Sequence, residues 1–296
     1  MTGCAATVAR RTLAREWRPR PAYRVGVLTL VSIHSYPVKG CRGLDHASAR
    51  LTPAGLEHDR EWMFATPDSR FVTQRDEPRL ACIDAVVRDG ALHLAAEGAG
   101  AVAVPLAQEG RRGRVKVWND DCGAIDQGDE AARWVTELLG RELRLLRFDP
   151  EVPRPSDPAW VGALDAPNRY SDGFPLLVVS LASLADLNAR LAVPVPMARF
   201  RPNLVFDGLA AWGEDDLDEV IRGDVRLRVV KPCTRCVVTT TDQRSGERHG
   251  DEPVRTLRGF RWNAALRGVV FGQNAVVVDG AGATLEVGQA FAGSAR

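Results

Sequence analysis

The sequence contains few of the residue types that build zinc sites or disulfide-stapled scaffolds. Its 296 residues include only five histidines and six cysteines. The histidines are scattered, and their spacing matches no convincing zinc-binding set. Among the cysteines, only Cys233 and Cys236 lie close together in sequence. This usage is typical of a reduced cytoplasmic protein in which a cysteine serves chemistry rather than cross-linking.

Net charge and long apolar runs are also lacking. The 39 basic and 38 acidic residues leave a net charge of +1, so no global positive field is present to hold a nucleic acid or an anionic membrane. No apolar run approaches the roughly 18 residues that a membrane-spanning helix requires. The usual nucleotide-binding, zinc-protease and serine-hydrolase motifs are missing as well. We therefore expect neither a nucleic acid nor a membrane as partner.

Residues 1–24 differ in composition from the rest of the chain. They contain six arginines against the single acid Glu16. The apolar stretch of a secretory signal is missing, although an arginine-rich and acid-poor segment partly matches a transit peptide. Because chain termini are usually poorly ordered, we expect a disordered extension here.

From Val25 onward the sequence is typical of short strands joined by tight turns. Asp89-Gly90 separates two apolar-rich runs, which is a strong signal for a β-hairpin. Several short strands at close spacing favour a barrel or a meander over parallel α/β units. The strands that we expect in the first half are Val25–Val38, Arg60–Thr66, Phe71–Thr73, Ala81–Val87, Ala91–Ala95, Val102–Leu106 and Val115–Trp118.

The rest of the chain adds helices, a boundary and further strands. Asp129 is placed to cap a helix that Gly140 ends, and a second helix is expected from Ser180 or Ser183 to Leu191. The proline-rich segment Asp149–Pro167 is the best candidate for a linker, and it divides the chain into residues 25–148 and 168–296. The remaining expected strands are Pro175–Val179, Asn203–Phe206, Val225–Val230, Cys236–Thr241 and a closing hairpin of Ala275–Asp279 with Thr284–Val287.

The pair Cys233 and Cys236 is the main candidate for chemistry, and its spacing has four interpretations. A structural zinc site needs a second pair of ligands, and none follows in the sequence. A thioredoxin-like pair opens a helix, whereas the β-branched run after Cys236 is typical of a strand. The thiols can also be small buried hydrophobes, or one thiolate can bind a soft, redox-active metal beside Lys231 and Arg235. Spacing alone does not decide between these interpretations.

Motifs along almost the whole chain, from Val27 to about Phe291, resemble those of one family. In the second half, Lys231-Pro232-Cys233-Thr234-Arg235-Cys236 and its neighbours resemble the MOSC domain, named after the C-terminal domain of molybdenum-cofactor sulfurase. Motifs in the first half resemble the β-barrel domain that precedes it in the subfamily of the mitochondrial amidoxime-reducing components and their bacterial relatives. The other motifs, in chain order, are Tyr36–Cys41, His58–Trp62, Gln74–Leu80, Arg199–Val205, Glu252–Leu257 and Phe271–Asn274.

The resemblance implies a fold and a metal ligand. The expected fold is mainly β (α+β), with an N-terminal β-barrel-like domain and a C-terminal MOSC β-barrel domain that has a few helices. In this family the second cysteine of the pair ligates molybdenum, which maps to Cys236 and leaves Cys233 as a nearby thiol. The implied cofactor is the molybdenum cofactor (Mo-pyranopterin). A thiolate is a suitable soft donor for such a metal.

The resemblance also implies residues that hold the phosphate tail of the cofactor. Such a tail requires cations and hydrogen-bond donors. By position in the motifs, Lys39 and Arg60 would supply them from the first domain, and Arg201 and Asn203 from the second. The ordinary alternative for Lys39 and Arg60 is an exposed ion pair, which is common and weak.

Two further residues are weaker candidates for the same site. Asp172 lies where the family has an acid near the metal, where it would position a substrate or relay protons. Its alternative is to cap a turn, which is the commoner role of Asp before Gly. Thr240 would face the cofactor, or it only satisfies the local backbone.

The activity that the resemblance implies is reduction of N-hydroxylated small molecules, namely amidoximes, hydroxylamines and N-hydroxylated bases, with molybdenum and without pyridoxal phosphate. The sequence has no spare cysteine group for an iron–sulfur cluster. We therefore expect a separate electron donor, either a ferredoxin-like or a cytochrome b5-like protein with its reductase. One alternative is a carrier of the cofactor, or of sulfur as a persulfide on Cys236; another is a metal-free binding module. Lys39 and Arg60 favour the reductase, because a sulfur carrier does not need them.

Overall fold

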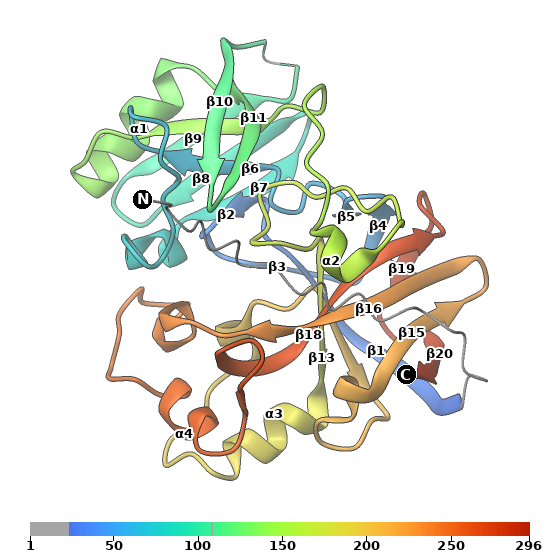
Figure 1. The fold of residues 1–296 in the computed structure, drawn as a ribbon. Helices are drawn as coiled ribbons and strands as arrows, with labels where there is room; N and C mark the ends of the chain where they lie inside the picture. The colour runs from blue at the N-terminus through green and yellow to red at the C-terminus, as the bar shows by residue number, and fades with distance from the viewer. Residues whose placement is uncertain (1–23, 108) are drawn as a thin grey trace, which may run out of the picture.

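The computed structural model describes residues 24–107 and 109–296, which form mainly β-structure with four α-helices (Figure 1). The mainly β class predicted from the sequence is confirmed. The predicted disordered head lies outside the described residues, except for Arg24, with which the first strand begins. Among the described residues, no helix has the length and apolarity needed to cross a membrane.

Seven strands close into a barrel. In spatial order they follow β13, β14, β1, β20, β15, β16 and β18, and pairing of β13 with β18 closes the ring. Within this ring, β13 and β14 are the only parallel neighbours. Leu28 and Leu30 alternate with exposed residues along β1 and point into a core where Phe206 and Phe291 meet edge to face at 5.4 Å. The bounds are β1 Arg24–Ser35, β13 Leu176–Ser180, β14 Leu204–Asp207, β15 Leu217–Arg222, β16 Val225–Thr234, β18 Gly268–Asp279 and β20 Ala290–Ala295.

Two further sheets, called here the N-terminal sheets, lie beside the barrel (Figure 1). The five-stranded sheet has the order β10, β11, β12, β6, β2, and the three-stranded sheet has the order β7, β8, β9. Helix α1 (Asp129–Leu139) buries Trp134 and Val135 in their core, next to Trp62. The bounds are β2 Val38–Lys39, β6 Trp62–Ala65, β7 Asp84–Arg88, β8 Ala91–Ala96, β9 Gly100–Pro105, β10 Arg112–Val117, β11 Asp120–Asp126 and β12 Arg144–Phe148.

Short elements complete the fold around the barrel. Strand β3 pairs with β1, β17 pairs with β18, and β4 pairs with both β5 and β19. The predicted division into residues 25–148 and 168–296 stays a prediction; β1 and β3 belong to the sheet that forms the barrel. The bounds are β3 Leu44–His46, β4 Ser48–Thr52, β5 Gly55–Leu56, β17 Trp262–Asn263, β19 Thr284–Glu286, α2 Pro158–Val161, α3 Leu181–Asn188 and α4 Val254–Arg258.

The expected hairpin at Asp89-Gly90 is present, and both turn residues have the positive φ that such a turn requires. The end of α1 at Gly140, which is left-handed, is also confirmed. Its start is not, because Gly128 is the N-cap and Asp129 is already helical. Helix α3 begins after Ser180 as expected and ends at Asn188 rather than Leu191. The expected linker contains helix α2. Strands β11 and β12 were not expected from the sequence.

The expected strand at Cys236–Thr241 is wrong. After Cys236 the chain forms a 3-10 helix, η4 (Val237–Thr240). The Thr239 hydroxyl donates to the Cys236 carbonyl at 2.9 Å, and the Thr240 hydroxyl donates to the Val237 carbonyl at 2.8 Å. Such local bonds offer the backbone an alternative to a sheet ladder. They outweigh the preference of β-branched residues for strands.

The expected closing hairpin is also wrong. Both of its strands exist, but β18 pairs with β16 while β19 pairs with β4. The Gly280–Gly282 turn bonds to Leu51 instead: Gly282 donates to the Leu51 carbonyl, and Leu51 donates to the Ala283 carbonyl. The turn therefore redirects the chain towards β4 rather than reversing it along β18.

A buried carboxyl joins α3 to the barrel. Glu214, in the 3-10 helix η3 (Gly213–Asp216), is fully buried and accepts hydrogen bonds from the Ser183 hydroxyl at 2.6 Å and the Ser180 amide at 3.4 Å. Burial raises the pKa of Glu214 to about 6, despite these two donors. The folded protein therefore binds a proton here more tightly than the unfolded chain does.

We expect Glu214→Gln to remove part of the pH dependence of stability. A raised carboxyl pKa contributes stability that is present below the unfolded pKa of 4.5 and is lost as pH rises through about 6. Because Gln stays neutral, can still accept from the Ser180 amide and can donate its own amide N–H to the Ser183 hydroxyl, the variant should exceed the wild type in free energy of unfolding by ~2 kcal/mol at neutral pH. Urea unfolding at several pH values measures this difference, with the exposed Asp224→Asn as control. An unchanged pH profile would contradict the expectation.

Candidate active site

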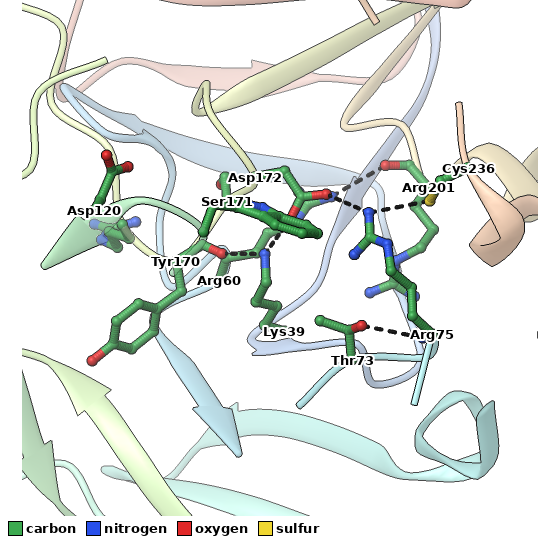
Figure 2. Close-up of polar contacts among 12 residues, drawn as sticks. Lys39, Arg60, Thr73, Arg75, Asp120, Tyr170, Ser171, Asp172, Arg201 and Cys236 are labelled. Atoms are coloured by element: carbon green, nitrogen blue, oxygen red, sulfur yellow. Dashed lines mark hydrogen bonds and ion pairs between the residues drawn. The ribbon is translucent and has the colours of Figure 1, made fainter. Parts of the chain in front are cut away.

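A cavity of about 150 Å³ lies where loops of the N-terminal sheets meet loops of the barrel. Its lining comes from the end of β2, the 73–75 loop, the 171–174 loop, the 200–203 loop and the 233–239 segment. These segments lie far apart in sequence, and the close-up in Figure 2 shows their polar side chains turned towards one another. Six of the seven predicted site residues line this cavity: Lys39, Arg60, Asp172, Arg201, Asn203 and Cys236.

The seventh predicted residue, Thr240, is not in the lining. It is buried, its hydroxyl bonds to the Val237 carbonyl, and its own carbonyl accepts from Arg199 at 2.7 Å. Its neighbour Thr239 lines the cavity instead. The reason is η4. Side chains of a strand alternate between two faces, whereas those of a 3-10 turn follow a repeat of three residues, so a different side chain faces the cavity.

Cys236 lies at the N-cap of η4, where β16 has ended, and its thiol is partly exposed to the cavity. Its Sγ accepts a hydrogen bond from Nη2 of Arg75 at 3.2 Å. Cys233 has a different guanidinium partner, since its Sγ accepts from Nη1 of Arg235 at 2.8 Å. Both cysteines are free thiols. Within residues 24–107 and 109–296, no cluster of three or more His, Cys, Asp or Glu side chains could hold a metal on its own.

Two like charges in the cavity lining are packed against one aromatic ring. The guanidinium groups of Arg60 and Arg201 lie 4.2 and 4.1 Å from the ring centre of buried Tyr36. Both arginines have a left-handed backbone, with φ of 47° and 53°. Asp59 forms an ion pair with Arg60 at 2.5 Å. Burial, reinforced by the charge of Arg60, lowers the pKa of Arg201 to about 10. Positive charge is therefore in excess here, as an anion-binding site requires.

Asn203 fixes one of these arginines rather than facing a ligand freely. Its Oδ1 accepts from Arg60 at 2.9 Å and from the Leu177 amide at 3.1 Å. Its Nδ2 donates to the His34 carbonyl at 3.1 Å. The carboxamide thus connects the Arg60 side chain to barrel strands β1 and β13.

Lys39 and Asp172 form an ion pair across the cavity. Nζ of buried Lys39 donates to Oδ1 of Asp172 at 2.5 Å and to the Tyr170 carbonyl at 2.7 Å (Figure 2). Burial lowers the pKa of Lys39, against the opposing effect of Asp172. The Asp172 side chain is 59% exposed, and although desolvation in the cavity acts against its ionisation, the charges of Lys39 and Arg75 hold its pKa well below the usual range. Asp172 therefore stays ionised and accepts hydrogen bonds rather than donating a proton.

A buried arginine fixes the loop that carries Asp172. Arg154 donates to the carbonyls of Arg169 and Ser171 at 2.5 and 2.7 Å. The same guanidinium forms two bonds with Oδ2 of Asp120, at 2.7 and 2.9 Å. The backbone next to Asp172 is thus tied to strand β11 of the N-terminal sheets.

Arg75 is the main site residue to which sequence reasoning assigned no role. Its guanidinium lies 4.5 Å from the ring centre of Trp118, 3.5 Å from Asp172 Oδ2 and 3.2 Å from Cys236 Sγ. The motif Gln74–Leu80 was part of the family resemblance, so the signal was present. Sequence order does not show that a loop of the N-terminal sheets reaches a thiol 161 residues away.

We expect inorganic phosphate or pyrophosphate to stabilise the protein through Arg60 and Arg201. A ligand at ten times its Kd adds about 1.4 kcal/mol to the free energy of unfolding when it binds only the folded state. Thermal unfolding with and without pyrophosphate should show this gain in the wild type and its loss in Arg60→Gln and Arg201→Gln. The exposed Arg222→Gln should keep the full gain. Equal stabilisation of all four proteins would place the anion elsewhere.

Comparison with known proteins assigns the two parts of the chain to family models. Residues 27–142 match the MOSC N-terminal beta barrel domain, and residues 165–292 match the MOSC domain. The cavity lining draws on both matched regions.

Similar full-length proteins agree with these matches. The chain is 36% identical to mitochondrial amidoxime-reducing component 1 of Mus musculus, over 86% of this chain and 78% of that protein. It is 35% identical to the Homo sapiens component 1, over 83% and 76%. Identity to the Homo sapiens component 2 is 33%, over 86% and 80%. The chain therefore belongs to the MOSC family, in the group related to the mitochondrial amidoxime-reducing components.

Proposed function

We propose that this protein is a molybdenum-cofactor-dependent reductase of N-hydroxylated compounds: amidoximes, hydroxylamines and N-hydroxylated bases. One observation carries the proposal. The cavity brings a partly exposed thiol together with five cationic side chains and a single carboxylate. Such an excess of positive charge around a thiol suits a ligand that is anionic and contains a thiophilic metal.

The residues present fit the molybdenum cofactor at both of its ends. Cys236 offers a soft sulfur donor, which binds a metal after losing its proton. Arg60 and Arg201 offer guanidinium groups for the terminal phosphate, and planar guanidinium groups match phosphate oxygens well. Both kinds of group line the same cavity. All three cations already donate to acceptors of the protein: Lys39 to Asp172 and the Tyr170 carbonyl, Arg60 to Asp59 and Asn203, and Arg201 to the Cys41 carbonyl and Gln243. A phosphate would share or replace some of these contacts.

Reduction of an N-hydroxylated compound consumes two electrons and two protons, breaks the N–O bond and releases water. When bound, the cofactor would supply the two-electron redox chemistry. The chain supplies binding, orientation and charge. Cys236 would hold the metal of the cofactor, and Arg60 with Arg201 would hold its phosphate. Asp172, ionised beside Lys39, offers an exposed hydrogen-bond acceptor at the cavity to which an N–H or N–OH group of an N-hydroxylated substrate can donate.

The electrons would come from a separate protein of the ferredoxin-like or cytochrome b5-like kind. The relatives' names describe them as components, which supports a system of more than one protein. The free cysteines among the described residues lie at positions 41, 82, 122, 233 and 236, and they form no cluster site in this part of the chain. The predicted cytoplasmic location stays a prediction.

The decisive measurement is molybdenum and pterin content per chain, in protein purified from a host that makes the cofactor. We expect near-stoichiometric molybdenum in the wild type and its loss in Cys236→Ser. Reduction of an aromatic amidoxime, driven by a chemical reductant, should be abolished in the same variant. Folding should be largely intact, because the thiol is part-exposed and packs no core cluster.

Cys233→Ser is the matched control. It should retain molybdenum and substantial activity, because the family resemblance assigns metal ligation to Cys236, whereas the Cys233 thiol bonds to Arg235. Equal loss in both variants would indicate that the two cysteines act as a pair. Wild-type protein without molybdenum from a competent host would refute the reductase and favour a sulfur carrier.

A further inference from the structure

Each thiol of the cysteine pair has its own guanidinium. Arg75 donates to Cys236 Sγ at 3.2 Å, and Arg235 donates to Cys233 Sγ at 2.8 Å. The two arginines come from different parts of the chain. Arg235 is a sequence neighbour of the pair, whereas Arg75 reaches it from the N-terminal sheets. The contact made by Arg75 is therefore a product of the tertiary fold.

Several independent elements hold Arg75 in this place. Its guanidinium lies over the Trp118 ring, at the turn between β10 and β11, and within 3.5 Å of Asp172 (Figure 2). Its amide donates to the Thr73 hydroxyl at 3.1 Å. Arg248, from the barrel side, donates to the Arg75 carbonyl at 3.4 Å. Side chain and backbone are both restrained, so the donor is aimed before any ligand binds.

We propose that Arg75 is a positioning residue that donates a hydrogen bond to the sulfur of Cys236 in the loaded enzyme and raises the reduction potential of the site. The inference rests on the proposed function, because it requires Cys236 to ligate the metal. A ligating sulfur keeps lone pairs that can accept an N–H donor. Arg75 can therefore keep its place while the sulfur is coordinated.

The direction of the effect follows from charge. Reduction adds electrons to the metal and its sulfur ligands. A fixed cation with an N–H group on the sulfur stabilises that electron-rich state, and hydrogen bonds to ligating sulfurs are a recognised means of setting potentials. Removing the guanidinium should therefore lower the potential. For a one-electron step, a tenfold loss of this stabilisation corresponds to about 59 mV.

Arg235 provides an internal control of the same chemistry. It lines the same cavity, carries the same group and also touches a cysteine sulfur. Its sulfur, however, belongs to the cysteine expected not to ligate the metal. Arg235→Gln removes the same charge from the same cavity. A difference in midpoint potential between Arg75→Gln and Arg235→Gln therefore separates the effect of the contact with Cys236 from the effect of the positive charge of the cavity as a whole.

The test is a redox titration of the molybdenum-loaded protein, followed by the paramagnetic resonance signal of Mo(V). We expect Arg75→Gln to lower the midpoint potentials by an amount that corresponds to a tenfold change in the redox equilibrium. Arg235→Gln should leave the midpoint potentials near those of the wild type. Arg75→Lys keeps the charge but cannot span Cys236 and Asp172 with one planar group. It should give an intermediate shift, and it supplies the comparison if Arg75→Gln does not load metal.

Three results would overturn the inference. Unchanged midpoint potentials in both Arg75 variants would show that the contact between Arg75 and Cys236 does not affect the reduction potential of the metal. Equal shifts in Arg75→Gln and Arg235→Gln would reduce the effect to the net charge of the cavity. Absence of a molybdenum signal in the wild type would refute metal ligation by Cys236 and the inference with it, and molybdenum content separates that failure from the other two.

Discussion

Two guanidinium groups packed against one aromatic ring are a costly arrangement, because like charges repel and burial removes their hydration. Arg60 and Arg201 nevertheless lie against Tyr36, and only Arg60 has a close carboxylate partner, Asp59. The surrounding structure maintains this arrangement through Asn203 and two left-handed backbone positions. Much of the architecture around the cavity can be understood as support for this unbalanced positive charge.

The loop that carries Asp172 provides the counter-charge and also a mechanical connection. One carboxylate accepts from Lys39, Trp118 and Arg75, which belong to three different segments of the N-terminal part of the chain. Arg154 fixes the adjoining backbone. The acid that the resemblance placed near the metal is thus better suited to orienting cations than to giving up a proton, because its pKa is held low.

The cysteine pair shows why local pattern and tertiary position have to be considered together. The β-branched run after Cys236 favours a strand, yet threonine hydroxyls bonded to nearby carbonyls produce a 3-10 turn. That turn places Thr239 rather than Thr240 at the cavity. The two thiols then acquire different guanidinium partners, which gives chemically similar neighbours different environments.

The sequence by itself determined the β-rich class, the hairpin at Asp89-Gly90, the end of α1 at Gly140 and, through ordered motifs, six of the residues that line the cavity, but neither Arg75 nor the place of Thr240. These features depend on short-range conformational preferences or on residue identities that a motif records directly. Only the tertiary structure decided that β18 and β19 take different partners, that β1 joins the barrel, and that Arg75 contacts Cys236. Each of these depends on pairing between segments distant in sequence, whose energy comes from packing and hydrogen bonds that local pattern does not encode.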